Sequence, residues 1–214
     1  MIIEQMPQAV RGFYPTVLWR GKKNEKCIYL TFDDGPTEEN TMWILRKLDD
    51  FGIKATFFCI GKNAEEKQAL FEEIKRRGHC VGSHGYSHVR GLWLHSKEYF
   101  SDIRKAASII KSKLYRPPHG RIRPVQALYL SRRYKIVLWD VITRDYDRDL
   151  RPEDVYQIAV KYGRNGSIVV FHDSVKARTN MRYAFPKAVE YWKAQGFEFK
   201  TLDDLSPTEE EQQK

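Results

Sequence analysis

The stretch CIYLTFDDGP at residues 27–36 joins a short apolar run to an abrupt polar ending. Its first six residues are rich in β-branched and aromatic side chains, which predicts a buried β-strand. Asp33 and Asp34 follow at the end of this strand. Adjacent carboxylates repel each other and resist burial, so the pair indicates a metal site, a proton-transfer site or both. The alternative is a helix cap, for which Pro36 is a favourable first residue, but capping accounts for one aspartate and not for two.

Similar apolar runs recur along the chain and alternate with longer amphipathic stretches. The runs give about seven candidate strands, at residues 27–32, 55–60, 80–82, 114–116, 135–140, 167–171 and 198–201. Helical periodicity is clearest over residues 38–51, 64–77 and 97–113. Alternation of strands and helices is typical of an α/β protein with parallel strands.

Polar side chains gather where these candidate strands end. The following residues lie at the carboxyl end of a candidate strand or follow it: Asp33, Asp34, His84, His88, Arg116, Asp145, His172 and Asp173. An open parallel sheet concentrates its site at one switch point, whereas a parallel barrel collects groups from many strands on one rim. Contributions from five strands therefore favour a barrel whose active site lies at the C-terminal ends of the strands.

The composition is that of one globular domain. With 214 residues, 42% of them hydrophobic, the chain can bury a sizeable core. We expect residues 1–25 to form an N-terminal arm packed on the barrel, residues 26–204 to form the catalytic domain, and residues 205–214 to be an acidic, disordered tail. The three cysteines form no CxxC pair and lie in apolar runs, which indicates buried thiols in a reducing compartment.

The net charge of +9 raises the question of an anionic partner. The Lys and Arg residues are scattered through the helical stretches and form no nucleic-acid-binding motif. We interpret them as a solvated basic surface and expect no nucleic-acid partner. Neither a signal peptide nor a transmembrane segment is recognisable, so we expect a cytoplasmic protein. Aromatic and basic residues among the first 20 leave a peripheral membrane contact open as the alternative to a packed arm.

The segment SHGYSH at residues 83–88 places His84 and His88 four residues apart. On a helical turn this spacing puts both imidazoles on one side, within reach of one ion. Alone, the HxxxH pattern is weak evidence, because hydrogen-bonded histidines are common. With an aspartate from the end of a neighbouring strand, two histidines make a three-ligand site of the kind that holds Zn²⁺ or a similar divalent cation.

Four motifs in order along the chain resemble those of a known family. TFDDGP at 31–36, SHGYSH at 83–88, RPPHG at 116–120 and VVFHDS at 169–174 are similar to the successive motifs of the polysaccharide deacetylases, the NodB-homology enzymes of carbohydrate esterase family 4. The resemblance spans residues 26–202. It implies a distorted (β/α)₇ barrel and a metal-dependent hydrolase that removes N-acetyl groups from amino sugars of a glycan or oligosaccharide.

The resemblance implies roles for individual residues around the metal. Asp34, His84 and His88 would bind one divalent cation, with Zn²⁺ favoured and Co²⁺ or Ni²⁺ as alternatives. Asp33 would be the general base that takes a proton from the attacking water. Arg116 would pair with this carboxylate and position it.

A second group of residues is implied on the other side of the site. His172 would be the general acid that protonates the departing amine, and Asp145 would orient and charge its imidazole. Asp145 has an alternative interpretation as part of a solvated loop, because polar residues surround it. The backbone N–H of His119 would help to hold the oxyanion, and Trp139 and Tyr146 would lie near the sugar-binding groove.

The sequence departs from the family pattern at four positions. Gly85 replaces the usual Ser or Thr, and His119 stands where Tyr or Phe is common. A further family motif, which has aspartate, two residues, aspartate and tryptophan, corresponds to ITRDY at residues 142–146, where Ile142 and Tyr146 replace the first aspartate and the tryptophan. The base, the ligands and the acid are intact, so we expect catalysis to be retained, while the walls of the site differ. Two alternatives stay open: an amidase of the same fold that acts on a small non-sugar amide, and an inactive glycan-binding module, which Gly85 and Ile142 motivate.

Overall fold

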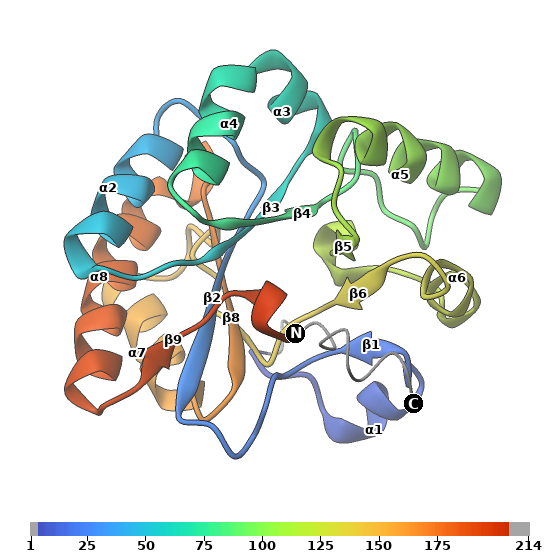
Figure 1. Cartoon of the computed structure of the whole chain (residues 1–214). Helices are drawn as coiled ribbons and strands as arrows, with labels where there is room; N and C mark the ends of the chain where they lie inside the picture. The colour runs from blue at the N-terminus through green and yellow to red at the C-terminus, as the bar shows by residue number, and fades with distance from the viewer. Residues whose placement is uncertain (1–3, 206–214) are drawn as a thin grey trace.

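The computed structural model describes residues 4–205 and shows a curled sheet of parallel strands with helices along its outer side (Figure 1). The strands are β1 (Val17–Leu18), β2 (Cys27–Asp33), β3 (Thr56–Cys59), β4 (Cys80–Ser83), β5 (Leu114–Tyr115), β6 (Lys135–Val137), β7 (Val141–Ile142), β8 (Ser167–His172) and β9 (Glu198–Phe199). The α-helices are α1 (Gln8–Gly12), α2 (Thr41–Phe51), α3 (Gly61–Glu66), α4 (Gln68–Arg76), α5 (Ser96–Ile110), α6 (Pro124–Leu130), α7 (Pro152–Tyr162) and α8 (Arg178–Ala194). Short 3₁₀ helices are η1 (Pro118–Gly120), η2 (Val175–Ala177) and η3 (Leu202–Leu205).

The strand order explains why the sheet curls. The order is β1-β6-β5-β4-β3-β2-β8-β7, with β9 paired to β2 off this path, and the paired strands run parallel. β6 and β7 are consecutive in the chain, yet β6 pairs with β5 and β1 while β7 pairs with β8. The continuous segment of β6 and β7 therefore joins the two ends of the sheet, because β6 pairs with the end strand β1 and β7 is itself the other end strand. This connection bends the sheet toward a distorted barrel.

The expected parallel α/β fold is confirmed, with differences in detail. Residues 135–140, expected as one strand, divide into β6 and the approach to β7, because the backbone changes partner there. The N–H of Leu138 donates to the carbonyl of Leu18 at 2.8 Å, and the N–H of Asp140 donates to that of Ile168 at 3.0 Å. Strand β1 was not expected from the sequence. The helix expected over residues 64–77 is likewise divided into α3 and α4.

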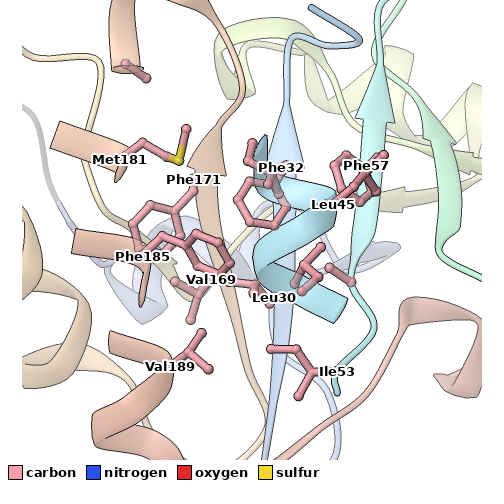
Figure 2. Packing of buried hydrophobic residues seen from close by; sticks show 14 of the residues in the cluster. Leu30, Phe32, Leu45, Ile53, Phe57, Val169, Phe171, Met181, Phe185 and Val189 are labelled. Carbon is pink, nitrogen blue, oxygen red and sulfur yellow. The ribbon is translucent and has the colours of Figure 1, made fainter. Parts of the chain in front are cut away.

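Strand β2 occupies the middle of the sheet, between β3 and β8, and all seven of its residues are buried. The ring of Phe32 stacks on Phe57 with 5.2 Å between centroids and meets Phe185 of α8 edge-on at 5.2 Å (Figure 2). Burying one side chain of this size stabilises the fold by roughly 1.5–3 kcal/mol. The apolar run thus anchors the strand, and this anchoring sets the position of Asp33 at its end.

The first part of the chain contacts the sheet directly. β1 pairs with β6, Arg11 Nη2 donates to Asp140 Oδ1 at 2.8 Å, and the N–H of Ile142 donates to the carbonyl of Glu4 at 3.0 Å. The division into an arm, a catalytic domain and a tail stays a prediction. Residues 206–214 of the expected tail lie outside the described residues.

The three cysteines are buried free thiols, as the sequence indicates. None of the helices within residues 4–205 combines the length and the hydropathy that crossing a bilayer requires.

Candidate active site

The end of β2 gives its two aspartates different surroundings. Asp33 is the last strand residue, is 2% exposed and is paired in register with His172 of β8. Asp34 leaves the strand with φ 83, in the left-handed region that aspartate tolerates better than most residues. This backbone conformation turns the second carboxylate toward two histidines that follow β4.

Asp34, His84 and His88 form one cluster of potential metal ligands. Asp34 Oδ1 lies 3.2 Å from His88 Nε2 and 3.7 Å from His84 Nε2, and ligand atoms of all three residues lie within 4.8 Å of one another. His84 Nδ1 lies 2.8 Å from the carbonyl oxygen of Arg116. The ring therefore donates its Nδ1–H to that carbonyl, which directs Nε2 at the cluster, as a ligating histidine requires.

The two histidines do not lie on a helical turn, so the geometry expected from their spacing is wrong. Residues 84–95, all of them described, contain no helix between β4 and α5. The loop instead bends at Gly85, with φ 77, and at His88, with φ 55. Both values are left-handed, and such turns bring the imidazoles together where a helix would continue away from the sheet.

Asp102 of α5 fixes this loop, and no feature of the sequence singled it out. Its carboxylate accepts the backbone N–H of Tyr86 at 2.8 Å and of Ser87 at 2.9 Å. A Cβ on Gly85 would lie 2.9 Å from Asp102 Oδ2, and the left-handed backbone adds strain for any side chain there. The departure from Ser or Thr at Gly85 therefore matches the local backbone.

The charge states of the cluster suit a divalent cation. Burial disfavours a charged Asp34, but the hydrogen bond from His88 and the neighbouring imidazoles hold the pKa of this carboxyl well below its usual range. Burial lowers the pKa of His84 to about 4, so its imidazole is neutral at neutral pH. One carboxylate and two imidazoles fit Zn²⁺, Co²⁺ and Ni²⁺, and these donors do not select among the three ions.

Arg116 is fully buried and holds Asp33 in place. Its Nη1 donates to Asp33 Oδ1 at 2.6 Å and to Thr31 Oγ1 at 2.8 Å. Its Nε and Nη2 donate to the carbonyl oxygens of Val137 and Leu138 at 3.3 and 3.2 Å. The second carboxylate oxygen of Asp33, Oδ2, faces the histidine cluster and lies 4.0 Å from His84 Nε2. One oxygen is thus fixed while the other faces the site.

His172 and Asp145 make the second buried pair. Asp145 Oδ1 lies 2.7 Å from His172 Nδ1, and Asp145 Oδ2 accepts the backbone N–H of His172 at 2.7 Å. Burial by itself would lower the pKa of His172, but the adjacent Asp145 carboxylate raises it to about 9. Asp145 is fully buried, so it is not part of a solvated loop. The Nδ1 contact leaves Nε2 of the imidazole available to the site.

The residues expected near the substrate have unequal exposure. The exposed His119 lies in η1 with φ 57, and its ring centroid is 4.5 Å from that of His88. The ring of Tyr146 meets His172 edge-on at 4.9 Å. Trp139 is only 8% exposed and lies against Gly120, where an added Cβ would be 2.3 Å from the indole ring. Trp139 therefore supports the η1 segment from beneath.

Asp173 is a further buried carboxylate at this rim, and the sequence suggested no role for it. It accepts the hydroxyl of Thr41 at 2.7 Å, and burial raises its pKa to about 7. A Cβ on Gly35 would lie 1.9 Å from Asp173 Oδ2, so the turn after β2 can approach this carboxyl only as glycine. Asp173 thus shapes the turn that carries the two aspartates of β2.

Comparison with known proteins identifies the family. Residues 20–137, more than half of the chain, match the model of the family described as polysaccharide deacetylase. The chain belongs to the polysaccharide deacetylase family. This result confirms the resemblance inferred from the four motifs.

Relatives of this family member are named as peptidoglycan deacetylases. A peptidoglycan-N-acetylglucosamine deacetylase of Bacillus cereus is 31% identical over 97% of this chain and 81% of the relative. The peptidoglycan-N-acetylmuramic acid deacetylase PdaC of Bacillus subtilis is 26% identical over 89% of this chain and 41% of the relative. Among solved structures, a peptidoglycan N-acetylglucosamine deacetylase superposes with a TM-score of 0.86, at 30% identity, over 93% of this chain and 96% of the other.

A solved structure described as a pseudoenzyme shares the fold of this chain. The crystal structure of a CE4 family pseudoenzyme of Bacillus anthracis superposes with a TM-score of 0.79 at 24% identity, over 87% of this chain and 67% of the other. At this identity the likeness concerns the fold alone.

Proposed function

We propose that this family member is a metal-dependent hydrolase that removes N-acetyl groups from the amino sugars of a glycan or oligosaccharide. The observation that carries the proposal is the cluster of potential metal ligands around Asp34, which has a buried pair on each side. On one side Arg116 fixes the carboxylate of Asp33. On the other side Asp145 fixes the imidazole of His172. The relatives are named for deacetylation of N-acetylglucosamine or N-acetylmuramic acid in peptidoglycan, which makes an N-acetylated glycan strand the preferred substrate class.

Asp34, His84 and His88 would hold the cation. When bound, it supplies Lewis-acid chemistry, because it lowers the pKa of a water molecule and polarises the acetyl carbonyl. We favour Zn²⁺, and Co²⁺ and Ni²⁺ accept the same donors. The bond from His84 Nδ1 to the carbonyl of Arg116 keeps one ligand aimed before any ion arrives.

Asp33 would act as the general base. Its free oxygen faces the cluster, and it takes a proton from the water whose oxygen attacks the acetyl carbon. The guanidinium of Arg116 fixes the other oxygen at 2.6 Å and balances the charge of a carboxylate that is almost fully buried. The Arg116 side chain therefore both orients the Asp33 carboxylate and balances its charge.

His172 would act as the general acid. As the C–N bond breaks, the sugar nitrogen takes a proton from His172 Nε2, and acetate and a free amine are the products. A pKa of about 9 keeps this imidazole protonated at neutral pH, which a general acid requires. Asp145 sets both the charge and the ring orientation through its contacts with Nδ1 and the backbone N–H.

The backbone N–H of His119 would stabilise the oxyanion that develops on the acetyl oxygen. Tyr146, which packs on the acid, and His119, which packs on His88, would form walls of the substrate site. Trp139 would act indirectly by supporting the η1 segment. Replacement of the usual residues by His119 and Tyr146 would then alter which sugars fit.

Acetate release tests the proposal. The full chain, loaded with Zn²⁺, should release acetate from N-acetylated chito-oligosaccharides or peptidoglycan fragments and not from O-acetylated xylan. It should not hydrolyse purine-derived amides, which is followed by loss of the amide itself. The substitution Asp33→Asn keeps an oxygen for Arg116 but cannot take a proton, so turnover should fall by roughly 10²–10⁴-fold while the metal content stays the same.

Asp50→Asn, on the exposed end of α2, is the matched control and should leave acetate release unchanged. Equal activity of the Asp33→Asn variant would overturn the assignment of the base. Hydrolysis of small amides alone would favour the amidase alternative, and glycan binding without hydrolysis of any substrate would favour the inactive module.

A further inference from the structure

Positive charge is concentrated in one segment of this chain, so the interpretation of the Lys and Arg residues as scattered is wrong for this segment. Ten of the 37 Lys and Arg residues lie between Asp102 and Asp140, and none of the 28 Asp and Glu residues does. The rest of the chain carries 27 basic and 28 acidic residues, so this one segment accounts for the net charge of +9. It includes most of α5 and all of β5, α6 and β6, which Figure 1 shows together on the right of the molecule.

Helix α6 within this segment buries Leu130 but exposes its other three large apolar side chains. Val125, Leu128 and Tyr129, at spacings of three and four residues, are 68%, 57% and 55% exposed. Gln126 is buried on the opposite side of the helix, beside Ala127. A surface helix normally turns its apolar stripe to the core, so an outward stripe of large apolar residues indicates a partner that covers it.

A neighbouring loop extends this apolar surface. Leu92 and Trp93 are 40% and 71% exposed, and their loop is tied to the start of α6. Arg123 Nη2 donates to the carbonyl of Leu92 at 2.9 Å, and Gln126 Nε2 donates to that of Gly91 at 3.1 Å. The exposed side chains of the loop and of α6 thus belong to one braced surface.

We propose that this surface docks on an anionic lipid bilayer. The docking face is defined as Leu92, Trp93, Val125, Leu128 and Tyr129. Its apolar side chains would enter the boundary between lipid headgroups and acyl chains, and the basic side chains around them would contact lipid phosphates. The sequence left a membrane contact open for the first 20 residues of the chain. The exposed apolar and basic side chains that such a contact requires lie instead on the docking face and around it.

The chemistry of the face distinguishes a bilayer from other anionic partners. Arg121 and Arg123 precede α6 and Arg132 and Arg133 follow it, which would suit any polyanion. A nucleic acid or an acidic glycan, however, offers no apolar phase for exposed leucine and valine side chains. A bilayer offers both the phosphates and the apolar phase, so it accounts for the combination. This inference does not depend on the proposed deacetylation.

Co-sedimentation with vesicles tests the inference. The full chain should bind vesicles of phosphatidylcholine with added phosphatidylglycerol, bind vesicles of phosphatidylcholine alone much more weakly, and lose affinity as salt rises. The double variant R132Q/R133Q should lose about 30-fold in affinity, because each arginine near the surface contributes about fivefold. The double variant W93S/L128S should lose at least about tenfold by removing apolar insertion.

The matched control is R46Q/R178Q, which removes the same charge from α2 and α8, on the left in Figure 1, and should keep its vesicle affinity. The inference is wrong if the full chain binds neither type of vesicle, or if R132Q/R133Q and R46Q/R178Q lose the same vesicle affinity. It is also wrong if W93S/L128S binds vesicles as tightly as the unaltered chain. In the last case, retained binding to heparin or duplex DNA would identify a polyanion as the partner. Acetate release from a small oligosaccharide should be the same in all three variants, so failure of docking and failure of the proposed activity are visible separately.

Discussion

Asp33 and Asp34 are neighbours in the sequence but have separate partners. Asp33 continues the strand and meets the buried guanidinium of Arg116 at 2.6 Å, whereas the left-handed backbone of Asp34 turns its carboxylate to His88, 3.2 Å away. Consecutive side chains of a strand point to opposite faces, but the turn at Asp34 brings its carboxylate back to the site that Asp33 faces. Asp33 Oδ2 lies 4.0 Å and Asp34 Oδ1 3.7 Å from His84 Nε2, while the other oxygen of Asp33 stays with Arg116. The adjacent acids can therefore do different work without sharing one proton.

Removal of one imidazole should remove the metal. His84→Ala deletes the ligand that the carbonyl of Arg116 orients, so Zn²⁺ affinity should fall by more than about 100-fold, and acetate release should fall with it. Competition with a chromophoric chelator measures the affinity. The matched control is His95→Ala, an exposed histidine that belongs to no ligand cluster among the described residues. Stoichiometric Zn²⁺ in the His84→Ala variant would contradict the ligand assignment.

The pH dependence of turnover should report the pair of His172 and Asp145. The acid works only when protonated, so kcat/KM should decline as the pH rises through the pKa of His172, which is about 9 without a cation beside Asp34. A bound cation offsets the charge of Asp34 and moves this decline to lower pH. Asp145→Asn removes the carboxylate that raises the pKa, so the decline should move down by at least about one pH unit.

The comparison requires kcat/KM over the full alkaline range for both forms of the enzyme. Ser174→Ala serves as a control at the neighbouring loop, because it leaves both carboxylate contacts of the imidazole in place. An alkaline limb that is identical in the Asp145→Asn variant would show that His172 is not the titrating acid.

The loop between β4 and α5 depends on a contact from the helix that follows it. Asp102 accepts two backbone N–H groups of the loop, and the loop carries both histidine ligands. Asp102→Ala should let the loop relax and weaken Zn²⁺ binding by about 10–100-fold, the range seen for residues that orient ligands. Glu98→Ala, an exposed acid on the same helix, should leave the affinity unchanged. Equal affinities in isothermal titration would show that the loop holds its shape without Asp102.

The closure of the sheet depends on one buried aspartate. Asp140 is fully buried and accepts hydrogen bonds from Arg11 at 2.8 Å, from Arg164 at 2.9 Å and from Ser167 at 2.8 Å. It thereby joins the N-terminal arm, the segment between β6 and β7, and the turn before β8. Asp140→Asn should lower the free energy of unfolding by about 2 kcal/mol, because it removes the buried charge to which the partly exposed guanidiniums of Arg11 and Arg164 donate.

The pH dependence of stability should change in the same variant. Burial alone would raise the pKa of Asp140, but Arg164, Arg11 and Ser167 lower it to about 2. A carboxyl whose pKa is lowered by folding stabilises the fold above its unfolded pKa of about 4, and this contribution is lost as the pH falls toward 2. Urea unfolding between neutral and acid pH should therefore show a shallower acid loss in the Asp140→Asn variant. Asp50→Asn is the exposed control, and an equal acid loss in both variants would contradict the role of Asp140.

Much of the fold and of the site follows from local patterns. The run at residues 27–32 predicts the central strand, and strand and helix alternation predicts the parallel sheet. The proposed ligands and the two buried pairs are recognisable because their residues occur in short motifs next to strand ends. The structure brings these motifs together, because parallel strands direct their carboxyl ends to the same rim.

Other features depend on contacts between distant parts of the chain. Asp102 lies sixteen residues from Tyr86 and belongs to no motif, and Asp140 meets Arg11 across 129 residues. The docking face likewise depends on which side of α6 meets the core, which its short apolar pattern leaves ambiguous. Sequence alone determined the strand with its two aspartates and the chemical types around them. Tertiary structure decided which oxygen faces which nitrogen, since those distances are set by packing and hydrogen bonds between segments that the chain order keeps far apart.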